Sequence, residues 1–212
     1  MSRKRPVRRR VSTNAFYWAL GLLFVLAFVA MRILIPAPIT LVQATTVGAA
    51  HFANGDTKAG GHGQTVDGIG CDAGNTILYH IHTHLSLFYD GQQIAIPMGV
   101  GIVPPRQVQA NFVVGGKCFY WLHTHDATGI IHVESPVQKQ FTLGDFFDIW
   151  GQPLRTGDVA GYHGSVVTVV DGKRYSGNPR DIVLGEHEQV TLEVGPPYPF
   201  PTAPTYTWPA GL

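Results

Sequence analysis

The stretch ILYHIHTHLSLFY at residues 77–89 alternates between two kinds of side chain in the manner of a β-strand. Successive side chains of a strand point to opposite faces, so one face is apolar except at Thr83 and the other carries three histidines. The apolar face consists of Ile77, Tyr79, Ile81, Leu85, Leu87 and Tyr89. Asp90-Gly91 follows and is typical of a two-residue hairpin turn, so we expect the chain to return as a strand over 92–96.

Strand patterns continue along the chain after this first hairpin. The further predicted strands are 118–125 and 130–135 with a turn at 126–129, 166–170 and 173–175 with a turn at Asp171-Gly172, 182–184, and 189–194. One short helix is predicted over 143–150, because Thr142 and Asp145 resemble a capping pair and Gly151 follows the last turn. These elements predict a mainly β domain, an antiparallel sandwich or partly open barrel with one short helix.

An almost uninterrupted apolar run covers residues 15–35, close to the ~20 residues that a membrane-spanning helix requires. Basic residues precede this run, and Arg32 near its end is able to reach the lipid headgroups. We therefore expect a single-pass anchor in the plasma (inner) membrane, with the C-terminal domain on the extracytoplasmic side. The alternative is a cleaved signal peptide with a cleavage site at 42–44, which places the domain on the same side.

These patterns divide the chain into five expected parts. They are a basic cytoplasmic tail at 1–14, a transmembrane anchor at 15–35, a linker and entry loop at 36–75, an extracytoplasmic β domain at 76–195, and a proline-rich tail at 196–212.

Charge is distributed unevenly between the N-terminus and the rest of the chain. Seven of the 15 basic residues and none of the 14 acidic residues precede residue 36, so the remaining 177 residues carry a net charge of −6. Nucleic-acid binding by the domain is disfavoured, because binding to the phosphate backbone requires a basic face.

The chain has two cysteines, Cys71 and Cys118, and both lie on the predicted extracytoplasmic side. An even number of cysteines in an oxidising compartment favours a disulfide. A thiol ligand or a redox function is the alternative, although the sequence contains no C-x-x-C motif.

The first group of candidate metal ligands is His80, His82 and His84, on one face of the first predicted strand. The outer two are ~13.6 Å apart along a strand that rises ~3.4 Å per residue, so we do not expect all three to bind the same ion. His82 is central in this group and is the predicted contributor to a shared site.

The second group follows from the register of the second hairpin. If 126–129 is the turn, His123 pairs with His132 and His125 with Ile130. One face then carries His123, His125, His132 and Glu134, whereas a slip of one residue would send His132 to the other face. Asp126 is expected to be a turn residue rather than a ligand.

Imidazole with carboxylate suits Zn, Cu(II), Fe or Ni, and among these we predict a copper or zinc ion as the cofactor. The two histidine groups either contribute to one site or form two adjacent sites. Since imidazole must be neutral to bind a metal, binding is expected to weaken as the pH falls through the range near ~6.5.

Three motifs together resemble a family of uncharacterised membrane-anchored extracytoplasmic bacterial and archaeal proteins: YWLHTHD at 120–126, GIIHVE at 129–134 and FTLGDFFDIWG at 141–151. The resemblance covers residues 76–195 and implies an extracytoplasmic β domain without implying an activity. Cupins also place H-x-H on a strand, followed by a glutamate. In this chain no glutamate follows three to four residues after His84 or after His125.

Three classes of function remain open at this level. The first is a membrane-anchored metal-binding protein, acting in metal buffering, in delivery to a protein partner or as a subunit of a membrane complex. The second is a metalloenzyme, either a hydrolase in which Glu134 or Asp126 is the general base toward a metal-bound water, or a cupin-like oxidoreductase. The third is an assembly subunit that binds no metal.

Overall fold

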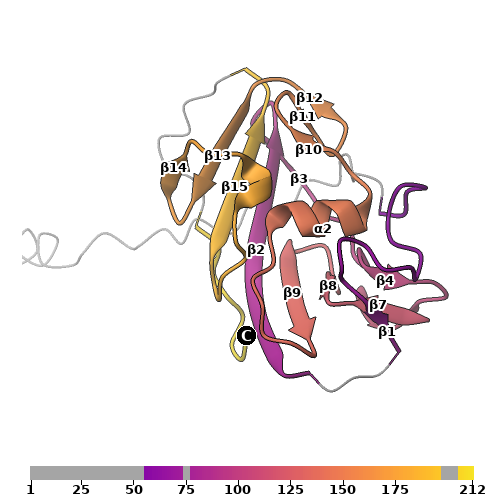
Figure 1. The fold of residues 1–212 in the computed structure, drawn as a ribbon. Coiled ribbons are helices and arrows are strands. Elements are labelled where there is room, and N and C mark those ends of the chain that lie inside the picture. The colour runs from indigo at the N-terminus through magenta and orange to yellow at the C-terminus, as the bar shows by residue number, and fades with distance from the viewer. Residues whose placement is uncertain (1–54, 74–76, 197–204) are drawn as a thin grey trace, which may run out of the picture. The chain divides into compact units, whose positions relative to one another are not determined.

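The computed structural model describes residues 55–73, 77–196 and 205–212, and this part of the chain is mainly β (Figure 1). The strands before the helix are β1 (Cys71–Asp72), β2 (Tyr79–Tyr89), β3 (Gln92–Ile94), β4 (Ile102–Val103), β5 (Gln107–Gln109), β6 (Phe112–Gly115), β7 (Cys118–Tyr120), β8 (Leu122–His123) and β9 (Ile130–Ser135). Helix α2 (Leu143–Trp150) is followed by β10 (Leu154–Arg155), β11 (Asp158–Val159), β12 (Tyr162–His163), β13 (Val166–Val170), β14 (Lys173–Tyr175), the 3₁₀ helix η1 (Pro179–Asp181) and β15 (Gln189–Val194).

The largest sheet has the strand order β14-β13-β15-β2-β9-β8, and β3 also pairs with β2. Its longest strand is β2, the alternating strand that the sequence predicted, and both of its faces are buried over most of its length. The strand pairs of the described sheets are antiparallel as predicted, except at the centre of this sheet, where β15 runs parallel to β2. The chain reaches β15 only after passing through α2 and the β13–β14 hairpin, which provides the long connection that a parallel pair requires.

Three smaller sheets complete the described fold, and the sheets do not close into a barrel. Their orders are β1-β7-β4, β10-β11-β12 and β5-β6. The strand predicted over 118–125 is divided, since β7 belongs to a small sheet and β8 to the large one. The division occurs at Trp121, whose indole N–H donates a 2.6 Å hydrogen bond to Asp72 of β1.

Helix α2 has the predicted boundaries and caps. The Thr142 hydroxyl accepts from the Asp145 N–H, and the Asp145 carboxylate accepts from the Thr142 N–H, so a complete capping box begins the helix. Gly151 ends it in the left-handed conformation (φ 73°) that glycine adopts without strain. Phe146, Phe147 and Trp150 are buried and belong to the same hydrophobic core as the apolar side chains of β2.

Two short predicted strands differ in the structure. The strand expected at 182–184 is reduced to a single bridge between Thr142 and Val183, directly after η1. The return strand of the first hairpin ends at Ile94, three residues before Pro97, instead of continuing to Ile96.

The described part of the predicted linker, residues 55–73, packs against the domain. Gly60 and Gly61 lie so close to it that a Cβ on Gly61 would be 2.5 Å from the Tyr120 ring. The Tyr120 hydroxyl donates to the Gln64 carbonyl and accepts from the Gly63 N–H at 3.0 Å. This part of the linker therefore contributes to the fold.

The predicted disulfide between Cys71 and Cys118 is confirmed, with a Cα–Cα distance of 5.4 Å. It joins β1 to β7, which are paired in register with Cys71 opposite Tyr120. The bond closes a loop of 47 residues that contains β2.

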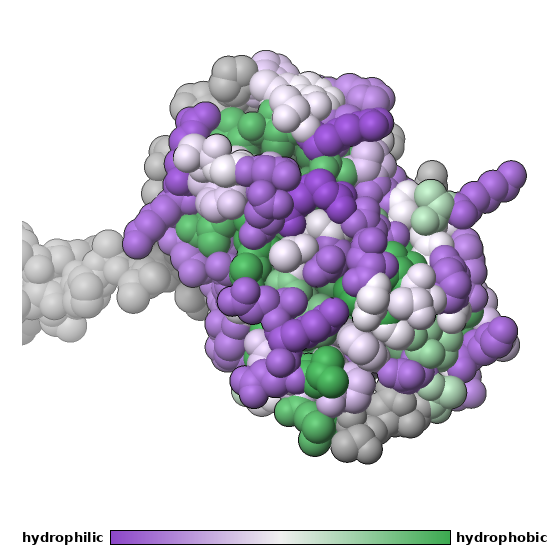
Figure 2. Space-filling model, in the orientation of Figure 1, coloured by the Kyte–Doolittle hydropathy of each residue, from purple (hydrophilic) through white to green (hydrophobic). Residues whose placement is uncertain are grey.

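Within 55–73, 77–196 and 205–212, no helix is long and apolar enough to cross a membrane. The predicted anchor at 15–35 and the cytoplasmic tail at 1–14 lie outside the described residues. On the face seen in Figure 2, hydrophobic residues form separate patches among hydrophilic ones.

Replacing both cysteines (C71S/C118S) should destabilise the protein by about 4 kcal/mol, because the disulfide restricts a 47-residue loop in the unfolded chain. Thermal unfolding of the purified variant, compared with the parent protein with and without reductant, measures this loss. Reduction of the parent should lower its melting temperature by a similar amount. Equal melting temperatures in all three samples would contradict the prediction.

Candidate metal centre

Three histidines lie in one row across three neighbouring strands. His132 on β9 is directly opposite His82 on β2 and directly opposite His123 on β8. Directly opposed residues share a face of the sheet, so the three imidazoles are on the side away from the apolar face of β2. The pairing of His123 with His132 is the one that the sequence predicted. The pairing of β2 with β9 could not be predicted, since the two strands are 40 residues apart.

A second row of side chains lies next to the first. Glu134 is opposite His80, and its carboxylate Oε1 is 3.4 Å from His80 Nε2 and 3.9 Å from His132 Nδ1. Strand β8 ends at His123, and His125 follows the strand. The predicted pairing of His125 with Ile130 is therefore wrong. The His125 ring nevertheless lies 4.6 Å from the His132 ring, centroid to centroid.

Backbone carbonyls determine which nitrogen of His123 and His125 carries the proton. His123 Nδ1 is 2.8 Å from the Tyr120 carbonyl oxygen, and His125 Nδ1 is 2.5 Å from the Val113 carbonyl oxygen. A carbonyl only accepts hydrogen bonds, so both Nδ1 atoms donate, and both Nε2 atoms carry a lone pair when the rings are neutral. Donation to a carbonyl is also the usual second contact of a metal-binding histidine.

The two Nε2 atoms of His123 and His125 are 3.1 Å apart. Two lone pairs at this distance repel unless a cation or a proton lies between them. Two nitrogens bound at ~2.0–2.1 Å to one tetrahedral ion would be about 3.3 Å apart, close to the observed distance. His80 Nε2 and His82 Nε2 are likewise 3.1 Å apart.

Two groups of side chains in the described structure could hold a metal ion, each with its ligand atoms within 4.8 Å of one another. One group is His123, His125, His132 and Glu134, and the other is His80, His82 and His132. These six residues were all predicted from the sequence as ligands, and His132 belongs to both groups.

Burial keeps the central imidazoles neutral. Desolvation, followed by the neighbouring histidines, lowers the pKa of His123 to about 3 and that of His132 to about 2. Burial also lowers the pKa of His82, with His80 as the next cause. Protonation of these rings therefore competes with a metal only well below pH 6.5. The expectation that metal binding weakens near that pH concerns the whole set of candidate ligands and stays a prediction.

His84, the seventh predicted ligand, does not belong to either group. Its Nε2 donates to the Thr128 carbonyl at 2.9 Å, its Nδ1 is 3.5 Å from the Ser86 hydroxyl, and its ring stacks on Tyr206 at 3.6 Å. Burial lowers its pKa to about 4. His84 is thus a neutral packed residue, consistent with the prediction that the outer histidines of its strand do not share one ion.

The remaining candidates have ordinary structural environments. Asp126 accepts from the Thr128 N–H at 3.0 Å and from its hydroxyl, so it is a turn residue as expected and is not placed to act as a base. His62 and His163 are exposed, and His187 stacks on Trp208. His51 lies outside the described residues.

Two contributions to the site were not predicted. The β5–β6 hairpin supplies the Val113 carbonyl and the Phe112 ring, which stacks on His125 at 4.5 Å. The C-terminal segment 205–212 supplies Tyr206, whose backbone N–H and carbonyl are both held by the Gln189 side chain. A backbone carbonyl leaves no trace in a sequence pattern, and no periodicity marks the return of the tail.

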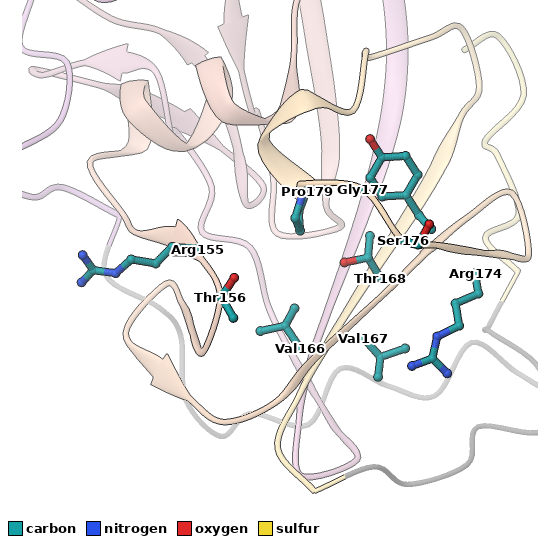
Figure 3. A pocket seen from close by; sticks show the side chains of 10 residues that line it. Arg155, Thr156, Val166, Val167, Thr168, Arg174, Ser176, Gly177 and Pro179 are labelled. Carbon is teal, nitrogen blue, oxygen red and sulfur yellow. The ribbon is translucent and has the colours of Figure 1, made fainter.

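A separate cavity of about 310 Å³ lies beside β13 and β14 (Figure 3). It is lined by Arg155, Thr156, Val166, Val167, Thr168, Arg174, Tyr175, Ser176, Gly177 and Pro179. The Arg155 guanidinium points away from the other lining residues and pairs with Asp158 at 2.8 Å. The lining contains no histidine or carboxylate, so the histidine cluster is the stronger candidate site.

This chain matches no protein-family model, and the searches of curated proteins and of solved structures gave no match. The resemblance to membrane-anchored extracytoplasmic proteins therefore stays a prediction.

His123→Ala and His132→Ala should each weaken Cu²⁺ or Zn²⁺ binding by about 100-fold or more, since loss of a residue that merely orients a ligand already costs 10–100-fold. Isothermal titration of the metal-free protein measures the change. His187→Ala is the matched control, because its ring packs on Trp208 and belongs to neither ligand group. Equal affinities in all three variants would refute the assignment.

The metal-free protein should lose stability as the pH falls below about 6.5. In the unfolded chain His84, His123 and His132 have pKa values near 6.5, whereas burial lowers them to about 4, 3 and 2 in the fold. Their stabilising contribution is complete above pH 6.5 and declines by about 1.4 kcal/mol per pH unit for each ring.

Melting temperatures between pH 7.5 and 5.5, with a chelator present, measure this decline. The variant His84→Gln should show a shallower decline, because one of the three titrating rings is removed while a donor to the Thr128 carbonyl remains. A melting temperature independent of pH over this range would show that the rings are not buried as described.

Proposed function

We propose that this protein holds a copper or zinc ion at the centre formed by His123, His125, His132 and Glu134, and that it acts in metal buffering or delivery outside the cytoplasm. The observation that carries the proposal is the 3.1 Å contact between two Nε2 lone pairs whose rings are fixed by backbone carbonyls. This arrangement is stable when a cation occupies the space between the nitrogens. Two nitrogen acceptors that face each other at this distance are unfavourable in a site that holds no cation or proton.

The distribution of burial supports exchange of the ion with a partner. His123 is fully buried and His132 nearly so, which excludes water from one side of the centre. His125 and Glu134 are half-buried, and His80 beside them is 47% exposed. A ligand from a delivery partner or a membrane complex can therefore approach from the exposed side while the buried rings still hold the ion.

The ligand types favour copper or zinc. Imidazole with one carboxylate suits both ions, and Cu(II) binds such sites more strongly at equal availability. Burial lowers the pKa of His123 and of His132, which favours the neutral form of these two rings that a metal requires.

The location rests on the sequence. The apolar run at 15–35 and the basic residues before it support a single-pass anchor with the domain on the extracytoplasmic side. A β domain with a disulfide is consistent with an oxidising compartment.

Two measurements test the proposal together. The full chain, expressed with its N-terminus intact, should sediment with membranes, and a chain without residues 1–35 should stay in the supernatant and melt cooperatively. Elemental analysis of the purified full chain should find copper or zinc, and a strong chelator should remove it. Protein that contains no metal and takes up neither Cu²⁺ nor Zn²⁺ would end the proposal.

A further inference from the structure

The two ligand groups meet at one residue. Strand β9 lies between β2 and β8. His82 on β2 and His123 on β8 are therefore the two neighbours of His132 in the row across the sheet. The ring of His82 lies 4.7 Å from that of His132, and the ring of His125 lies 4.6 Å from it, both at nearly right angles. Two imidazoles from β2 and two from β8 and the residues directly after it therefore lie on either side of the same central ring.

Each pair is spaced for an ion of its own. His80 and His82 have their Nε2 atoms 3.1 Å apart, and His123 and His125 repeat the same distance on the other side. An ion placed between one pair leaves the contact in the other pair unchanged. The His80–His82 contact is an N–H···N hydrogen bond when one ring donates to the other, and an ion between these nitrogens would replace that bond.

One ring nitrogen of His132 has no hydrogen-bond partner among the described residues. Its Nδ1 is buried and makes no hydrogen bond in the described structure, and the nearest charged atom, Glu134 Oε1, is 3.9 Å away. Leaving a buried polar atom without a partner costs about 1–3 kcal/mol, so such atoms usually have one. An imidazole has two ring nitrogens and can bind a different ion through each.

We propose that His132 bridges two metal ions, one held with His80 and His82 and the other with His123, His125 and Glu134. This inference rests on the proposed metal-binding function and adds a second ion and a bridging ligand to it. Both ring nitrogens of His132 are then occupied, and its one proton leaves to solvent as the second ion binds. Both pairs of facing nitrogens then have a cation between them.

Copper titration of the purified full chain tests the proposal, with Cu²⁺ as the probe. Elemental analysis after removal of excess ion should give two Cu²⁺ per chain. Two Cu²⁺ ions joined through one imidazolate couple their unpaired electrons, so the integrated EPR signal at low temperature should account for much less copper than elemental analysis finds.

Paired variants separate the two ions. His80→Ala with His82→Ala should leave one Cu²⁺ with full EPR intensity, and His123→Ala with His125→Ala should leave the other. The control is His163→Ala, because this side chain is 77% exposed and belongs to neither ligand group. This variant should keep two coupled ions.

The outcomes distinguish this inference from the proposed function. One Cu²⁺ per chain, or two with full EPR intensity, would overturn the bridge and leave the metal-binding function standing. Absence of any bound Cu²⁺ or Zn²⁺ would overturn both. The stoichiometry and EPR intensity of the unmodified chain decide the question even if a paired variant fails to fold.

Discussion

The pairing of β9 with β2 on one side and β8 on the other is the constraint on which the site depends. This pairing sets three imidazoles in one row and places the apolar residues of the same strands on the opposite face, against α2. Register is therefore held by the core, because a slip of one residue would place His132 among apolar side chains and Val133 among the imidazoles. The same packing that stabilises the domain positions the ligands.

Burial of these rings removes their nitrogens from water, so each nitrogen needs a hydrogen-bond partner within the protein. A neutral imidazole in a dry environment needs partners for both nitrogens, and the structure supplies them unevenly. His123 has a backbone carbonyl for Nδ1, and His84 has Thr128 and Ser86 for its two nitrogens, whereas His132 Nδ1 has none in the described structure. This unsatisfied nitrogen lies 3.9 Å from the Glu134 carboxylate, within a group of side chains that could hold a metal ion.

The division between β7 and β8 links this site to the rest of the domain. Because the chain leaves one sheet at Tyr120 and enters another at Leu122, the Tyr120 carbonyl is available to orient His123. The Cys71–Cys118 disulfide and the Trp121–Asp72 hydrogen bond hold β7 against β1 at this point. The end of the predicted linker, at Cys71 and Asp72, thus helps to hold the candidate ligand His123 in position.

Local patterns in the sequence determined most strands of the large sheet, the capped helix and the face on which His80, His82 and His132 lie, because period-two alternation and turn residues act within a few positions of one another. The strands of the smaller sheets, apart from β7, carry no such pattern and were not predicted. The pairing of His123 with His132 follows from a short hairpin for the same reason. The tertiary structure alone decided that β2 pairs with β9, that β15 runs parallel to β2, and that His84 is covered by Tyr206 while His82 is not. These contacts join residues 40 to more than 100 positions apart, and their partners are selected by the packing of the whole core, which no short stretch of sequence specifies.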